Sequence, residues 1–170
     1  MSALSSNLDI LTVRWLRSLK KGLKTRGNIE MTRLRSHEIE CSHCGLKQNV
    51  NIWESINVNV DPDLRQKLFQ GLINVFKCQK CEKQTFISVP LFYHDMEKGF
   101  CVQFFPLDWL EDDRLLLDAF TQEGDLNVAL FHLPETSDYI KRTHIVFDMD
   151  ELLRFITFRE RLCEVRKKAN

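Results

Sequence analysis

Four cysteines stand in two Cys-x-x-Cys pairs whose spacing is typical of a metal site. The pairs are Cys41-Ser42-His43-Cys44 and Cys78-Gln79-Lys80-Cys81. Each pair can turn two sulfurs toward one point, and two such turns together offer a tetrahedral cage of four thiolates, as in zinc ribbons. Gly45 suits the positive φ of a knuckle turn after the first pair, whereas Glu82 leaves the second turn less well specified. The spacing predicts one structural Zn²⁺ held by Cys41, Cys44, Cys78 and Cys81.

Other chemistries are open to the same cysteines. A redox dithiol would need only one pair, and disulfides are typical of secreted proteins, whereas this chain has no secretory signal. Iron in the same cage is the alternative to zinc. Cys101 and Cys163 lie outside the pairs, and each is expected to be a small buried apolar residue. The metal site therefore remains the favoured interpretation of the two pairs.

A second group of residues offers an active site away from the metal. Tyr93, His94 and Asp95 are predicted at a hairpin turn, with Trp53 and Glu54 as further candidates. A His–Asp pair can serve as base and orienter. Adjacent strand residues point to opposite faces, however, and cannot pair without a turn. The alternative interpretation is that His94 is a turn residue bonded to the backbone.

The distribution of charge separates three functional interpretations. The chain has 24 basic and 24 acidic side chains, so its formal net charge is zero. Residues 1–30 carry six basic and two acidic side chains, which leaves the rest of the chain acidic. An acidic body is a poor non-specific ligand for nucleic acid, so a nucleic-acid-binding zinc ribbon is the least favoured interpretation. A zinc module that binds a protein partner or a second copy of itself comes first, and an enzyme with a non-metal active site near His94 and Asp95 comes second.

Residues 1–36 are predicted to be a basic amphipathic extension of a zinc-binding domain that spans residues 37–170. Apolar residues at positions 8, 11, 15, 19 and 23 recur at helical spacing. A helix over residues 8–24 could contact a membrane surface or a partner groove. Met31 offers a second start, so residues 1–30 could be an upstream extension. No apolar run is long enough to span a bilayer and no signal peptide is evident, which favours a cytoplasmic location.

From Ile39 onward the pattern predicts an α+β fold. The expected architecture is a zinc-ribbon-like antiparallel β-sheet, with a short helix inserted between the two knuckles and a packing helix at the C-terminus. Alternating apolar residues predict strands on both sides of a bulge or bend at 53–55, where two alternations fall out of phase. Pro90 interrupts the strand predicted at 85–93, which places that strand at a sheet edge. Further strands are predicted at 72–76, 100–105, 126–133 and 143–147.

Helix starts and ends are signalled by capping residues. Asp61 is predicted to cap the inserted helix and Gly71 to end it. A short helix is predicted around 110–118, and Asp148 or Asp150 is predicted to cap the final helix. The apolar face of that helix is wider than one seam requires, so it could pack on the sheet and also contact a partner. Its apolar residues include Leu152, Phe155, Ile156, Phe158, Leu162 and Val165.

Several stretches of the chain share a pattern with one known family. They include Cys41–Gly45, Trp53–Val58, Asp61–Leu64, Asn74–Cys78, Val89–Asp95 and Ile145–Phe147. Together they resemble the CpXC family of bacterial proteins, over most of the chain. Ser42 and Gln79 stand where that family often has a proline, but proline is not a metal ligand. The family is largely uncharacterised, so the resemblance implies the fold and the four cysteine ligands rather than a reaction.

Overall fold

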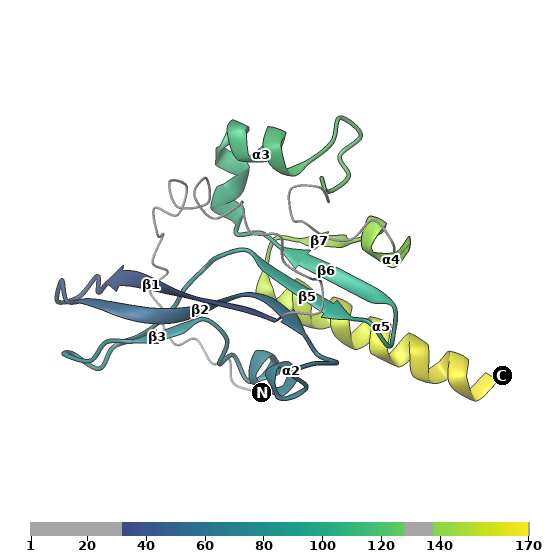
Figure 1. Ribbon diagram of the computed structural model, residues 1–170, viewed down its shortest axis with the longest axis horizontal. Helices are drawn as coiled ribbons and strands as arrows, with labels where there is room; N and C mark the ends of the chain where they lie inside the picture. Colours follow the sequence, from purple (N-terminus) through teal and green to yellow (C-terminus); the bar gives the residue numbers. More distant parts are fainter. Residues whose placement is uncertain (1–31, 128–137, 170) are drawn as a thin grey trace, which may run out of the picture.

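The computed structural model of the chain describes residues 32–127 and 138–169. Among these residues the largest sheet has five strands (Figure 1). The strand order is β1-β2-β5-β6-β7, and β3 and β4 form a separate two-stranded sheet. The strands are β1 Arg33–Glu40, β2 Lys47–Asn57, β3 Val75–Lys77, β4 Gln84–Phe86, β5 Leu91–Asp95, β6 Phe100–Phe104 and β7 His144–Val146. The helices are α2 Asp63–Phe69, η1 Leu107–Glu111, α3 Asp113–Ala119, α4 Asp138–Lys141 and α5 Met149–Ala169.

The α+β class is confirmed, and two of the predicted segments extend beyond the described residues. The helix predicted over 8–24 lies outside them and stays a prediction, as does the peripheral contact suggested for it. Most of the strand predicted at 126–133 also lies outside, and Leu126 forms an isolated bridge with Phe120. β1 begins at Arg33, so residues 33–36 of the predicted extension pair with β2 in the large sheet.

The large sheet is mixed, so the prediction of an antiparallel sheet was wrong. β1 pairs with β2 and β5 with β6 in antiparallel hairpins, but β2 pairs with β5 and β6 with β7 in parallel. Between β2 and β5 the chain passes through α2 and the β3–β4 hairpin. A parallel pair requires a long crossover of this kind, whereas an antiparallel pair can be joined by a short turn.

The strand predicted at 85–93 is in fact two strands in different sheets. Thr85 lies in β4 and Tyr93 in β5, with Pro90 between the two strands. β5 lies between β2 and β6 inside the large sheet, so the prediction of an edge strand was also wrong. Because Pro90 lies outside both strands, its missing N–H costs neither ladder a hydrogen bond.

The bulge predicted in β2 is confirmed. Arg33 pairs with Ser55 and Leu34 with Trp53, which leaves Glu54 as the extra residue. The Glu54 carboxylate lies 3.2 Å from Nε of Arg35. Burial raises the pKa of Glu54, and the nearby arginines only partly offset that effect. The bulge thus holds a half-buried acid beside basic residues of β1.

The inserted helix α2 has the predicted end but not the predicted cap. Pro62 is the residue before α2, it already has helical φ and ψ, and no side chain caps the helix. The carbonyl of Asp61 accepts the N–H of Leu64, so Asp61 takes part in a backbone turn and its assignment as the N-cap was wrong. Gly71 has φ +67° and ends the helix with the two backbone hydrogen bonds of a Schellman motif.

One face of the large sheet packs against α5 and forms the main core. Leu152 and Ile156 of α5 are fully buried, and Phe155 packs edge-on against Phe100 of β6. Burial of each such side chain contributes about 1.5–3 kcal/mol. The packing helix predicted at the C-terminus is therefore confirmed. The buried residues of this core are Ile56, Val58, Leu64, Leu68, Ile73, Leu91, Tyr93, Phe100, Val102, Phe104, Val146, Leu152 and Ile156.

Asp148 caps α5, as one of the two predicted alternatives required. Its Oδ1 accepts the N–H of Glu151 at 2.6 Å, and the Glu151 carboxylate accepts the N–H of Phe147 at 3.3 Å. The first bond satisfies a backbone donor that the first turn of a helix leaves free, and the second satisfies the N–H of the residue just before the cap. The C-terminal turn carries Arg166, Lys167 and Lys168, whose positive charge is favourable at that end.

Candidate metal centre

Two hairpins present the two cysteine pairs with the same backbone geometry. The first pair lies between β1 and β2, and the second between β3 and β4. In the first knuckle the N–H of Cys41 donates to the Leu46 carbonyl and the N–H of Gly45 to the Cys41 carbonyl, both at 2.9 Å. In the second, the corresponding bonds run from Cys78 to Lys83 and from Glu82 to Cys78, again at 2.9 Å. Within each knuckle, the two sulfurs therefore point to the same side of the turn.

The left-handed residue after each pair is the main local difference. Gly45 has φ +68° and Glu82 has φ +57°. Glycine adopts this conformation without steric cost, whereas a residue with a Cβ does so at a cost of about 1 kcal/mol. The second turn is therefore formed by a residue that disfavours it, in line with the weaker turn signal of its sequence.

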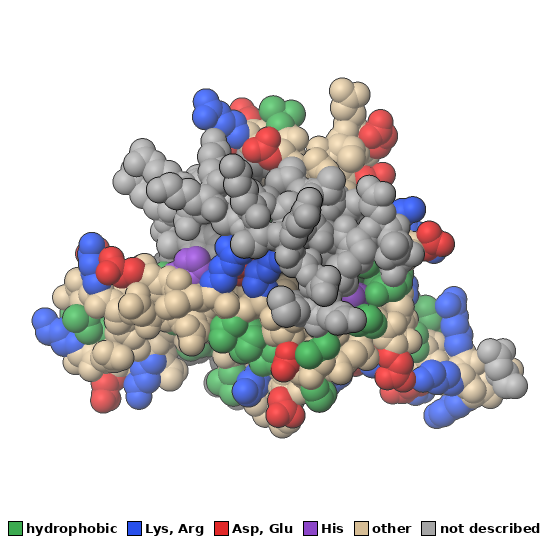
Figure 2. Space-filling view, in the orientation of Figure 1, with side chains coloured by type: hydrophobic (Ala, Val, Ile, Leu, Met, Phe, Trp, Pro, Cys, Tyr) green, Lys and Arg blue, Asp and Glu red, His purple; other side chains and the backbone are tan. Residues whose placement is uncertain are grey.

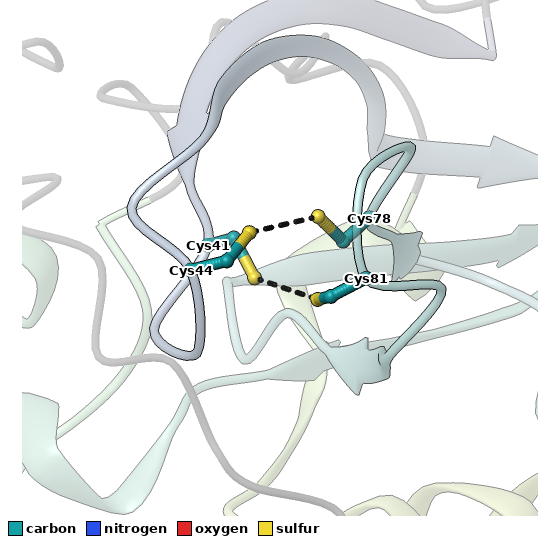
Figure 3. A group of neighbouring side chains, drawn as sticks. All are labelled: Cys41, Cys44, Cys78 and Cys81. Atoms are coloured by element: carbon teal, nitrogen blue, oxygen red, sulfur yellow. Dashed lines mark hydrogen bonds between the residues drawn. The ribbon is translucent and has the colours of Figure 1, made fainter.

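The four sulfurs meet in one cluster, which Figure 3 shows between the two turns. All four lie within 4.8 Å of one another. The Cys41 and Cys81 sulfurs are 3.6 Å apart and the Cys44 and Cys78 sulfurs 3.5 Å apart. A zinc ion with Zn–S bonds of about 2.3 Å requires sulfurs about 3.8 Å apart, whereas a disulfide requires about 2 Å. The cysteines are free, and their spacing fits a tetrahedral ion rather than two disulfides.

The cluster is half inside the protein. Cys41 and Cys78 are buried, and Cys44 and Cys81 are partly exposed. A small apolar core supports the buried side of the site; its other buried members are Ile39, Ile52, Phe76, Ile87 and Val89. An apolar floor excludes water from one side of the sulfurs and strengthens electrostatic interactions there.

Backbone amides and crowding affect the thiol pKa values in opposite directions. The N–H groups of Cys81 and Lys80 donate to the Cys78 sulfur and lower the pKa of that thiol to about 6, against the effect of burial. The N–H of Lys83 lowers the pKa of Cys81, but burial and the three neighbouring sulfurs together raise it. Crowded sulfurs thus oppose full ionisation of the cluster. A bound divalent cation would remove that opposition, since metal coordination deprotonates thiols.

The four sulfur donors limit which metal ions suit the site and what a bound ion could do there. Four soft thiolates in tetrahedral order suit Zn²⁺ or iron better than Mg²⁺ or Ca²⁺, which prefer oxygen ligands. Four protein ligands also fill the coordination sphere of zinc and leave no position for water or substrate. The four cysteines can therefore hold one metal ion in a closed, structural site.

One residue that contacts the second knuckle was not predicted from the sequence. The side chain of Gln48 in β2 bonds to the backbone on both sides of Cys78, at Lys77 and at Gln79. A polar residue in a strand after a cysteine knuckle carries no recognisable signal of such a contact. Only the period of the strand, which places Gln48 on the same face as Val50 and Ile52, could have indicated that it points inward.

The second set of candidate residues is not brought together as an active site. His94 lies in β5, and its Nε2 is 2.6 Å from the Tyr139 hydroxyl, so its assignment as a turn residue bonded to the backbone was wrong. Burial lowers the pKa of His94. Asp95 accepts the backbone N–H of Lys98 at 2.9 Å and its Nζ at 2.7 Å. The two neighbours thus have different partners, as opposite-facing strand residues must.

Tyr93 and Trp53 belong to the core on the α5 side. Tyr93 is fully buried and stacks on Phe100, and burial raises the pKa of its hydroxyl. Trp53 is partly buried, and its backbone N–H and carbonyl both bond to the side chain of Asn74. These contacts join Tyr93 to β6 and Trp53 to the start of β3, and none of them directs the two aromatic residues toward His94.

Comparison with known proteins identifies one family. Residues 39–166 match the family model described as CpXC protein. No curated protein and no solved structure matches the chain. Within the described ranges 32–127 and 138–169, no helix combines the length and the apolar character needed to cross a membrane. Because the match spans most of the sequence, the chain belongs to the CpXC family.

Proposed function

We propose that the chain is a zinc-binding module in which one structural Zn²⁺, held by Cys41, Cys44, Cys78 and Cys81, supports a domain that acts by binding a protein partner. The observation that carries the metal assignment is the cluster of four sulfurs, within 4.8 Å of one another, contributed by two hairpins. Sulfurs from separate hairpins face each other, so one ion would join elements that share no strand pairing.

The metal assignment is tested by metal analysis of the purified protein. The expected result is one zinc per chain in the wild type and in Cys163→Ser, which changes a cysteine outside the cluster. In Cys78→Ser the bound zinc should fall, because three thiolates hold the ion less tightly. Full zinc content in Cys78→Ser would refute the site, and a red protein that contains iron would refute zinc.

The surface we propose for the partner is the outer stripe of α5, formed by Phe158, Leu162 and Val165. Phe158 is 58% exposed and Val165 46% exposed, although both are apolar. The C-terminal half of α5 extends beyond the sheet in Figure 1, and Figure 2 shows basic side chains at its end. Exposed apolar side chains with a charged rim are typical of protein interfaces. This surface supports binding of a partner protein or of a second copy of the chain.

The partner surface is tested with Phe158→Glu and a matched control, Leu117→Glu, which changes an exposed leucine on α3. Partner proteins that bind the immobilised wild type should fail to bind Phe158→Glu and should still bind the control. If the wild type self-associates in sedimentation, Phe158→Glu should lose that association and the control should keep it. The zinc content should be unchanged in both variants. Equal behaviour of the two variants would refute the α5 stripe. A catalytic activity lost in His94→Ala with zinc retained would instead favour an enzyme.

A further inference from the structure

Two side-chain amides connect the β3–β4 sheet to the large sheet. Gln48 is the second residue of β2; its Nε2 donates to the Lys77 carbonyl at 3.0 Å, and its Oε1 accepts the Gln79 N–H at 2.9 Å. Lys77 and Gln79 flank Cys78 in the chain. The Gln48 carboxamide thus donates a hydrogen bond to the backbone on one side of Cys78 and accepts one from the backbone on the other side, as the backbone of a neighbouring strand would.

Asn74 makes the same kind of contact in the opposite direction. It precedes β3, and its side chain accepts the Trp53 N–H at 2.7 Å and donates to the Trp53 carbonyl at 2.9 Å. Asn74 therefore attaches the start of β3 to β2, whereas Gln48 attaches the end of β3, where the second knuckle begins. The two contacts differ in position: only the one made by Gln48 reaches the residues next to a cysteine.

The contact made by Gln48 matters because no backbone ladder joins the two knuckles. β2 and β3 lie in different sheets, so strand pairing does not fix Cys78 relative to the first knuckle. Gln48 lies two residues after Leu46, whose carbonyl closes the first knuckle by accepting the Cys41 N–H. The Gln48 side chain therefore links the start of β2, just after the residue that closes the first knuckle, to the backbone that bears Cys78.

We propose that Gln48 is a positioning residue of the metal centre, which holds Cys78 in reach of the first knuckle in the metal-free protein. This inference rests on the proposed zinc site. A site whose ligands are already in place loses less conformational freedom when the ion binds, so its affinity is higher. Both bonds of the amide are needed, since a donor and an acceptor fix the orientation of the Cys78 backbone and one bond alone leaves it free to turn.

The test measures the affinity of the purified full-length chain for Zn²⁺ by competition with a chromophoric chelator. Gln48→Met keeps the length of the side chain and removes both bonds, and Gln84→Met makes the same change at an exposed site on β4. The freedom that Cys78 gains in the metal-free variant must be lost again when the ion binds, and ordering one backbone residue is worth about a tenfold change in an equilibrium constant, so Gln48→Met is expected to weaken zinc binding by about tenfold. Gln84→Met should bind as the wild type does.

The affinity for zinc distinguishes a positioning role of Gln48 from a general stabilising role. A residue that only stabilised the fold would change the metal-free and the zinc-loaded protein equally, and would leave the affinity unchanged. With saturating Co²⁺, Gln48→Met should show the tetrahedral thiolate spectrum of the wild type, because the ion itself gathers the ligands once bound. A changed Co²⁺ spectrum would mean that Gln48 shapes the bound site rather than the metal-free one, and would overturn the inference.

A second variant keeps the test valid if Gln48→Met does not fold. Gln48→Asn retains a neutral amide but is one methylene shorter, so it cannot reach Lys77 and Gln79 together, and its affinity for zinc should also fall. Wild-type affinity in either variant overturns the role of Gln48 while the zinc site stands. Failure of the wild type to bind Zn²⁺ or Co²⁺ refutes the site itself, which is a distinct outcome.

Discussion

The two cysteine knuckles present the same kind of sulfur ligand, but the hairpin that carries the first is expected to be more stable than the hairpin that carries the second. The first joins strands of eight and eleven residues in the large sheet, and the second joins two strands of three residues each. A two-stranded hairpin of that size is marginally stable by itself. The first turn also has glycine at its left-handed position, where the second has Glu82. The same kind of cysteine pair can thus be carried by a long hairpin of the large sheet and by a short hairpin whose stability depends on its contacts with the rest of the protein.

Removal of the metal is expected to have the largest effect, and to act mainly on the second knuckle. A chelator should lower the free energy of unfolding by several kcal/mol, because a structural ion contributes folding free energy directly. Hydrogen exchange should then rise more at the amides of β3 and β4 than at those of β5 and β6, while the Gln79 N–H, which donates to Gln48, keeps part of its protection. Equal loss of protection in all strands would show that the two knuckles depend on the metal alike.

Substitution of Gly45 should have the next largest effect. Gly45→Ala is expected to destabilise the zinc-loaded protein by about 1 kcal/mol, because alanine must adopt positive φ there. The added Cβ would lie 4.0 Å from Oε1 of Glu40, so steric contact adds little to that cost. Urea unfolding measures the change, with Ser42→Ala in the same turn as the control. An unchanged midpoint for Gly45→Ala would show that the first turn tolerates strain as the second does.

The converse change in the second knuckle should stabilise the protein. Glu82→Gly is expected to raise the free energy of unfolding by about 0.5 kcal/mol, because it relieves the left-handed strain but adds freedom to the unfolded chain. Glu82→Ala keeps a Cβ at the same φ and should bring no such gain. If both variants stabilise the protein equally in urea unfolding, the effect of Glu82 comes from its charge and not from its backbone.

Surface charge beside the first knuckle should contribute least. Lys47 lies 3.9 Å from carboxylate oxygens of Glu38 and of Glu40, and all three side chains are well exposed. Lys47→Met should change the free energy of unfolding by less than about 0.5 kcal/mol, and salt should reduce that change further. Lys83→Met, at an exposed position of the second knuckle, is the control. A loss of more than about 1 kcal/mol for Lys47→Met would mean that charge pairs, and not strand length, make the first support stronger.

Features that depend on a few neighbouring residues were predictable from the sequence. The spacing of the cysteine pairs anticipated the sulfur cluster, since a short turn allows few arrangements of two sulfurs. Gly71 marked the end of α2 because few other residues adopt its positive φ. The phase change at Trp53–Ser55 located the bulge, because an extra residue inverts the alternation of faces.

Features that depend on distant parts of the chain were not predictable. Alternation within β2 indicates which of its residues face inward, but neither that alternation nor the fully buried β5 shows whether the two strands run parallel, which the crossover between them decides. The cap of α2 is a local exception: Asp61 has the residue type of a cap, yet its neighbour Pro62 already adopts helical angles and stands directly before α2. The contact of Gln48 with Lys77 and Gln79 joins residues that the sequence gives no reason to place together.

The parallel pairing of β2 with β5 bears on how quickly the chain can fold. Ser55 must meet Phe92, and the whole insertion with the second knuckle lies between them. Closure of so long a loop is entropically costly and slows folding of topologies rich in distant contacts. An ion bound early by both knuckles would tie Cys44 to Cys78 and leave only the short segment from Cys81 to Leu91 to search for its place. The bound ion would then speed the folding of the chain as well as join the two hairpins in the folded protein.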